Sequence, residues 1–222
     1  DKCYKTALEL NRVLGTMESS KVAHCDLSGP NLILSLNGHG GSDKEPISLI
    51  DLEEMYAPDL TQPKNLPAGS AGYAHCTASK GLWSPEADRF AGSILLANIL
   101  AWSDPAVVDA TFGENYFSPD EMHTYCPRYQ ALTSSLARTW GKPKADLFEA
   151  AWNSKELRDC PSFADWANEF HLSIEEIILP DSPPDSELFK PEAPKPGWNQ
   201  REKPILPEIN KSGPVLGYRP LF

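Results

Sequence analysis

The chain has 222 residues, which is enough for one sizeable hydrophobic core or for one domain with a tail. Its 41% hydrophobic and 23% charged residues are ordinary for a soluble globular protein. The formal net charge of −11 argues against binding to nucleic acid or to an anionic membrane surface, because both need a basic surface. We therefore expect neither kind of partner.

The five cysteines are odd in number, widely spread, and form no C-x-x-C pair. This spacing argues against a disulfide framework and favours a reducing compartment. The longest apolar run, around residues 94–102, is too short to span a bilayer, and no signal-peptide pattern opens the chain. We therefore expect a cytoplasmic protein.

The first third of the chain predicts one helix followed by a hairpin. Residues 5–17 carry apolar side chains at roughly helical spacing. Residues 32–34 and 47–50 are short apolar strands on either side of a glycine-rich loop, which predicts a β-hairpin with a long tip. Residues 51–83 are rich in Pro, Gly and Ala without periodicity, so we expect an extended functional loop there.

The rest of the first 178 residues predicts helices. Ser84 and Pro85 are typical of a helix start, and the helix predicted over residues 85–102 is apolar nearly all round, as in a helix at the centre of a domain. Ser118 opens a capping box. Helical patterns continue over residues 129–140, 145–152 and 162–170. The expected fold class is mainly α with a small β-hairpin.

The composition changes sharply after Leu179, where prolines arrive in quick succession. Such a segment is typical of an extended linker. We therefore expect one domain over residues 1–178 and a proline-rich tail over residues 179–222. Six apolar residues of the tail are candidate anchors onto the domain or a partner chain: Ile205, Leu206, Ile209, Val215, Leu216 and Phe222.

Three polar residues of the first third could carry phosphoryl-transfer chemistry. Asp26 and Asn31 lie five positions apart in a polar turn just before a strand, and Asp51 follows the paired strand. Phosphoryl transfer needs a carboxylate that orients the attacking hydroxyl and oxygen ligands that hold Mg²⁺ against the phosphates. The alternative is ordinary turn chemistry, in which Asp and Asn bond to the local backbone.

The sequence H-x-D-x-x-x-x-N over His24–Asn31, followed by a strand and Asp51, resembles the catalytic loop and metal-binding motif of protein kinases. The resemblance covers about residues 1–178 and implies the C-terminal helical lobe of that fold. It implies that Asp26 is the catalytic carboxylate and that Asn31 and Asp51 bind Mg²⁺ and ATP. It also gives His24 a structural role.

Two later segments resemble the same family in the same order. Gly69–Tyr73 resembles the G-T-P-x-Y stretch that ends an activation segment, here residues 51–77, and gives Ser70 a place in the catalytic site. The segment 84–90 resembles the start of the kinase helix whose aspartate anchors the catalytic-loop backbone. The resemblance gives Asp88 that role.

Several positions depart from the family pattern. Cys25 stands where most kinases have the Arg that reads a phosphate on the activation loop, so the chain resembles the bacterial-type, non-RD members. Ser28 stands where serine/threonine kinases carry a Lys near the transferring phosphoryl group. Glu53 replaces the glycine of D-F-G and is a further candidate metal ligand. Residues 74–77 replace A-P-E, so the structural Glu is lost.

No glycine-rich loop and no strand Lys precede His24. The resemblance therefore implies that the nucleotide-covering N-terminal lobe comes from the same parent protein or from another chain. We expect no turnover by this chain alone. With its other lobe, a lobe of this kind moves the γ-phosphoryl of ATP to a Ser or Thr hydroxyl of a protein substrate.

Two other functions remain open. A pseudokinase-like module that acts in binding or as a scaffold is favoured by Ser28, Glu53 and the lost A-P-E. A small-molecule kinase of the choline or aminoglycoside kind is suggested by the Ile-Asp-x-Glu pattern of residues 50–53. A separate and weaker hypothesis is a zinc site, for which the candidate ligands are His75, Cys76, His123 and Cys126.

Overall fold

The computed structural model describes residues 2–34, 47–113 and 115–170. The chain divides into two units, Asp1–Pro180 and Asp181–Phe222, and the fold described below is that of the first. The predicted proline-rich tail and its six candidate anchors lie outside the described residues. Among the residues that the structure describes, no helix combines the length and the apolar character that crossing a membrane requires.

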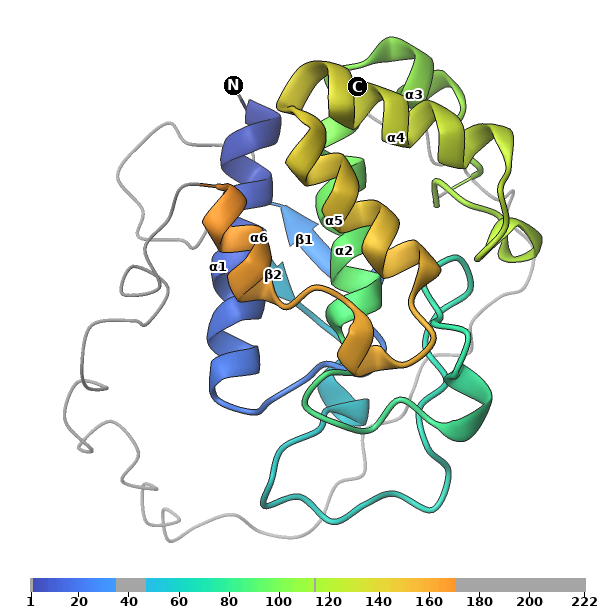
Figure 1. Cartoon of the computed structure of the whole chain (residues 1–222). Helices are drawn as coiled ribbons and strands as arrows, with labels where there is room; N and C mark the ends of the chain where they lie inside the picture. The colour runs from blue at the N-terminus through green and yellow to red at the C-terminus, as the bar shows by residue number, and fades with distance from the viewer. Residues whose placement is uncertain (1, 35–46, 114, 171–222) are drawn as a thin grey trace, which may run out of the picture. The chain divides into compact units, whose positions relative to one another are not determined.

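The first unit is mainly α-helical and contains a small β-hairpin, as the sequence predicts (Figure 1). The strands pair antiparallel, with Leu32 opposite Leu49. In chain order the elements are α1 (Lys2–Ser19), β1 (Leu32–Leu34), β2 (Ile47–Leu49), η1 (Leu52–Glu54), η2 (Ala78–Lys80), α2 (Arg89–Ala101), α3 (Pro105–Asp109), η3 (Pro119–Glu121), α4 (Pro127–Trp140), α5 (Lys142–Asn153), η4 (Leu157–Asp159) and α6 (Phe163–Glu169), where η marks a single 3₁₀ turn.

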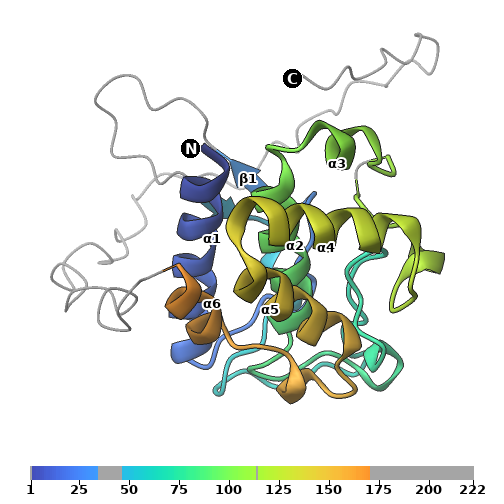
Figure 2. The same ribbon diagram turned by 45° about the horizontal axis from the view of Figure 1, so that its top comes forward.

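Helix α2 is the centre of the core. Every residue from Phe90 to Ala101 is buried, because α1, α4 and α5 pack around the helix (Figure 2). A fully buried Leu or Ile side chain contributes about 1.5–3 kcal/mol to the free energy of unfolding. The prediction of a helix that is apolar on all sides is therefore confirmed, and α2 is a rigid base for any residue attached to it.

The start of this helix differs from the prediction. Residues 85–88 form a turn and α2 begins only at Arg89, so Ser84 is not its cap. The Ser84 hydroxyl instead accepts the Glu86 N–H at 3.3 Å. Asp88 occupies the N-cap position without capping the helix by its side chain, because its carboxylate binds a distant loop.

Other boundaries also shift. Helix α1 is longer at both ends than residues 5–17, and β2 ends one residue before Ile50. The capping box at Ser118 is present but opens only the single turn η3, and α4 begins at Pro127, where the Cys126 sulfur accepts the Tyr129 N–H. Helix α3, which starts after Asp104, is not predicted from the sequence.

A buried histidine, His75, links the loop after β2 to the end of α5. Its side chain is held between the hydroxyls of Thr77 at 2.8 Å and Ser154 at 3.0 Å. Burial, together with the neighbouring His123, lowers the pKa of His75 from 6.5 to about 4. Protonation of this ring therefore opposes folding.

We expect the free energy of unfolding to fall as the pH is lowered from about 6.5 to about 4, with a slope of at most about 1.4 kcal/mol per pH unit from this residue. The sign follows because the unfolded chain binds more protons than the folded chain in this window. His75→Gln keeps a hydrogen-bonding side chain but cannot titrate. Urea unfolding at pH 7.5 and pH 5 measures the effect, and an equal loss of stability in both proteins contradicts this assignment.

Candidate functional site

The loop of residues 24–31 is fixed to the core helix by one buried carboxylate. Asp88 Oδ2 accepts the His24 N–H at 2.6 Å and Oδ1 accepts the Cys25 N–H at 2.9 Å. Desolvation raises the pKa of Asp88, and the two amide donors act against that rise because they favour the charged form. Cys25 takes a φ of 68°, in the left-handed region, within this turn. The loop therefore has a strained backbone that Asp88 holds in place.

His24 connects the loop to the second strand. Its side chain is fully buried, and its Nε2 lies 2.8 Å from the carbonyl oxygen of Ile50. The Asp26 N–H lies 3.4 Å from His24 Nδ1. Both contacts are satisfied if Nε2 carries the proton and donates to Ile50 while Nδ1 accepts from Asp26. The imidazole thus joins the residue before Asp51 to the backbone of Asp26.

The side chains of Asp26, Asn31 and Ser70 meet at one point. Ser70 Oγ donates to Asp26 Oδ1 at 2.7 Å. Asn31 Nδ2 donates to the Asp26 carbonyl oxygen at 2.8 Å and lies 3.4 Å from Asp26 Oδ2. The half-buried carboxylate is therefore oriented from both sides, and the Asn31 carbonyl oxygen Oδ1 is left as the atom of that amide which could bind a cation.

Asp51 enters the same region through the hairpin. The Ile50 N–H donates to the Asn31 carbonyl at 3.0 Å, which continues the strand pairing by one residue and places Asp51 just beyond Asn31. Asp51 takes a left-handed conformation with φ 65° and ψ 56°, and the chain then turns into η1. Asp51 and Glu53 are both exposed.

The two carboxylates interact directly. A hydrogen bond with Asp51, together with its charge, raises the pKa of Glu53 above its usual value. Two neighbouring carboxylates and an amide oxygen are hard oxygen donors of the kind that Mg²⁺ binds, with phosphate or water oxygens completing the shell. In the described ranges, no group of three or more His, Cys, Asp and Glu side chains could hold a metal ion by itself, so a cation at Asp51 and Glu53 would need oxygens from Asn31, phosphate or water.

We expect Asp51→Asn to lower the pKa of Glu53 toward its ordinary value, because the hydrogen bond to a carboxylate and the like charge are both removed. A ¹³C NMR titration of the Glu53 carboxyl measures the change, with Asp59→Asn in the same loop as the matched control. In the unsubstituted chain, we expect added Mg²⁺ to lower the same pKa. An unchanged Glu53 pKa in Asp51→Asn would contradict the shared interaction.

Ser28 contributes to the shape of the loop and not to its exposed surface. The Ser28 side chain is buried, at 1% exposure, and its backbone carbonyl accepts the Asn31 N–H at 3.2 Å. Ser28 therefore shapes the loop and does not lie open to a substrate in this conformation. Residues 24–31 contain no Lys or Arg, so the loop itself supplies no such cationic side chain to the site.

Two further contacts of the site were not predicted. Ala23 and Tyr56 exchange both backbone hydrogen bonds, at 3.0 and 2.8 Å, and so tie the chain before His24 to the chain after Asp51. The buried Tyr73 contacts the backbone N–H of Gly29 through its hydroxyl, while burial raises the pKa of that phenol. No pattern in the sequence indicates either contact, because each joins segments that are far apart along the chain.

The candidate zinc ligands do not form a metal site. The rings of His75 and His123 pack edge to face at 5.5 Å, and the His123 ring stacks on Phe90 at 4.6 Å. The Cys126 sulfur accepts a backbone N–H at the start of α4. Within the described segments these side chains form no three-ligand cluster, so the zinc interpretation is wrong for this part of the chain.

Comparison of the chain with family models, curated proteins and solved structures gave no match. The geometry of residues 24–31, 51–53, 70 and 88 therefore carries the functional argument.

Proposed function

We propose that this chain is the C-terminal lobe of a protein-kinase-like phosphotransferase that moves the γ-phosphoryl group of ATP to a Ser or Thr hydroxyl. One observation carries the proposal: the carboxylate of Asp26 is oriented by Ser70 and Asn31 at 2.7–3.4 Å, on a loop whose backbone is fixed to the central helix by Asp88. Ordinary turn chemistry does not require a hydroxyl 44 residues away to bind the same carboxylate.

In the proposed reaction Asp26 orients the acceptor hydroxyl and takes its proton. Because Ser70 occupies Oδ1, Oδ2 is the oxygen that would accept from the substrate. The acceptor oxygen forms a bond to the γ-phosphorus, the bond to the β–γ bridging oxygen breaks, and ADP leaves. Asn31, Asp51 and Glu53 would hold Mg²⁺, which neutralises charge on the phosphate oxygens when it is bound.

The proposal includes a partner. The proposed reaction needs a lobe that covers the nucleotide, and we propose that this lobe comes from the same parent protein or from another chain. The acidic balance of the chain suits a basic protein substrate, since opposite charge raises the local concentration of the substrate. The proposed partners are therefore a nucleotide-covering lobe and a protein substrate.

One contact supports a second candidate function, that of a small-molecule kinase. Glu53 forms a hydrogen bond with Asp51 and so places a second carboxylate at the proposed cation site. This arrangement suits a small-molecule kinase of the choline or aminoglycoside kind, which the Ile-Asp-x-Glu pattern resembles. A scaffold protein would need neither carboxylate. Binding of Mg²⁺ would therefore favour a protein kinase or a small-molecule kinase over a scaffold protein.

The test is an acceptor panel. The protein, together with its nucleotide-covering lobe, is incubated with Mg²⁺ and γ-³²P-labelled ATP and with a Ser/Thr-rich protein, choline or kanamycin as acceptor. Label transferred to Ser or Thr supports the proposal, and label on choline or kanamycin supports the second candidate. A folded protein that binds neither Mg²⁺ nor ATP and labels no acceptor is a scaffold.

A further inference from the structure

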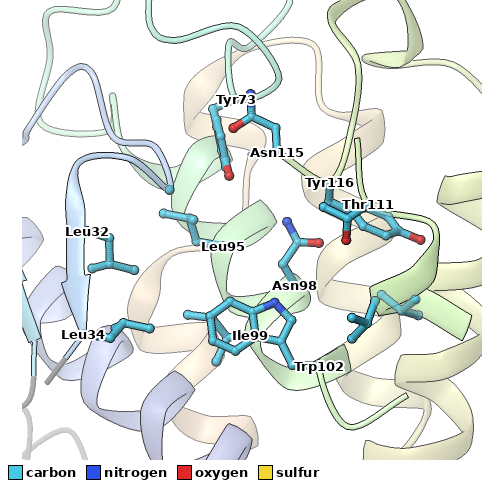
Figure 3. Close-up of a pocket in the computed structure, with 13 residues that line it drawn as sticks. Leu32, Leu34, Tyr73, Leu95, Asn98, Ile99, Trp102, Thr111, Asn115 and Tyr116 are labelled. Carbon is cyan, nitrogen blue, oxygen red and sulfur yellow. The ribbon is translucent and has the colours of Figure 1, made fainter. Parts of the chain in front are cut away.

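A pocket behind the catalytic loop is separate from the chemistry described above. It has a volume of about 250 Å³ and lies between β1, α2 and the segment from α3 to Tyr116 (Figure 3). Its walls include apolar side chains of the strand, the central helix and α3, namely Leu32, Leu34, Leu95, Ile99, Val107 and Val108. Neither Asp26 nor Asp51 lines the pocket.

Two residues that line the pocket, Asn98 and Asn115, have a side-chain Oδ1 that is buried without a hydrogen-bond partner in the described part of the chain, and Asn98 is the more buried of the two. Asn98 projects from α2 into the space between Tyr73, Trp102 and Thr111 (Figure 3). Its side chain is only 7% exposed, and its Oδ1 is buried without a hydrogen-bond partner in the described part of the chain. A buried acceptor of this kind destabilises the folded chain when it stays unsatisfied, because it has lost its bond to water. A ligand that donates one hydrogen bond would recover that cost.

The walls restrict the ligand further. None of the residues that line the pocket is charged, so a charged ligand would lose its hydration without gaining a partner. Three aromatic side chains, Tyr73, Trp102 and Tyr116, favour contact with another ring. A cavity of roughly 150 Å³ holds benzene, so this larger pocket has room for a fused pair of rings.

We infer that this pocket binds an uncharged aromatic group with a hydrogen-bond donor for Asn98, of which indole is the simplest example. The ring lies against the apolar wall and Trp102, and its N–H donates to Asn98 Oδ1. Gly29 and Tyr73 also line the pocket, so an occupant contacts both the catalytic loop and the segment that carries Ser70. The site does not depend on the proposed phosphoryl transfer.

The test is an NMR titration of the ¹⁵N-labelled chain with indole and with benzofuran, which has the same shape but no donor. We expect indole to bind about fivefold more tightly, the value of one net hydrogen bond. We expect shifts at the Asn98 side-chain amide and the Trp102 indole N–H. No binding of indole, or equal binding of the two compounds, would overturn the inference.

Two variants locate the site. Asn98→Leu removes the acceptor, so indole binding weakens about fivefold to the level of benzofuran. Val108→Trp fills the pocket from its half-buried edge, so both compounds lose binding, and this variant alters no buried polar group. Asn153→Leu, at an exposed position at the end of α5, is the matched control and leaves both affinities unchanged. Indole binding that survives Val108→Trp would show that the ring binds elsewhere.

A third compound identifies the source of the ring. N-acetyl-tryptophanamide binds as tightly as indole if the pocket takes a tryptophan side chain of a peptide. It binds more weakly than indole if the pocket takes a free small molecule, because the pocket then has no room for the peptide backbone. Both results support the ring site and differ only in where the ring comes from.

Discussion

Asp88→Ala is expected to lower the free energy of unfolding by about 3 kcal/mol, because it leaves the buried N–H groups of His24 and Cys25 without an acceptor. Each unsatisfied buried donor costs about 1–3 kcal/mol. Asp88→Asn keeps one acceptor oxygen but turns an amide donor toward the other N–H, so a loss of about 2 kcal/mol is expected. Urea unfolding at pH 7 measures both values.

Asp109→Ala is the matched control for Asp88→Ala. Asp109 is exposed at the end of α3, so its removal should change stability by no more than about 0.5 kcal/mol. Amide hydrogen exchange adds a local readout: the His24 and Cys25 amides should lose protection in Asp88→Ala. If Asp88→Ala and Asp109→Ala unfold at the same urea concentration, Asp88 does not anchor the loop.

Asp26→Asn is expected to lower kcat for phosphoryl transfer by about 10² to 10⁴-fold in the protein that includes the nucleotide-covering lobe, since an amide cannot take the acceptor proton. Ser70→Ala removes only the hydrogen bond that orients the carboxylate, so a loss of about tenfold is expected. Ser70→Thr keeps the hydroxyl and should restore most of the rate. This rescue would show that the hydroxyl, and not the size of the residue, matters.

Stability provides the control for the Asp26 comparison. Asp26 is only half-buried, and Asn preserves its shape, so Asp26→Asn should unfold within about 0.5 kcal/mol of the unsubstituted protein. A loss of rate without a loss of stability then separates chemistry from folding. Equal rates for Asp26→Asn and the unsubstituted protein would exclude Asp26 as the proton acceptor.

The mainly α fold and the hairpin could be predicted because both depend on local periodicity. Helix α2 is apolar on every side, and the strands at Leu32–Leu34 and Ile47–Leu49 are short apolar runs. The start of α2 could not be predicted this way. Ser84 and Pro85 carry a strong local start signal, but the long-range contact of Asp88 with residues 24 and 25 fixes where the helix begins.

The residues of the candidate site could be named from motif spacing, but their geometry could not. Spacing alone suggests that Asp26, Asn31 and Asp51 converge. It does not show that Ser70 donates to Asp26, or that Asp51 raises the pKa of Glu53. Burial is also a property of the folded chain, so the unpartnered oxygen of Asn98 has no signature in the sequence.

We propose that Asp26, Asn31 and Asp51 together form a phosphoryl-transfer site. Its most direct measurement is the transfer of ³²P from γ-labelled ATP to a Ser/Thr-rich protein by this chain combined with its nucleotide-covering lobe, with and without Mg²⁺. We expect Mg²⁺-dependent labelling of Ser or Thr that is lost in Asp26→Asn and in Asp51→Asn. Labelling that persists in both variants, or a folded protein that binds Mg²⁺ and ATP but labels no acceptor, would contradict it.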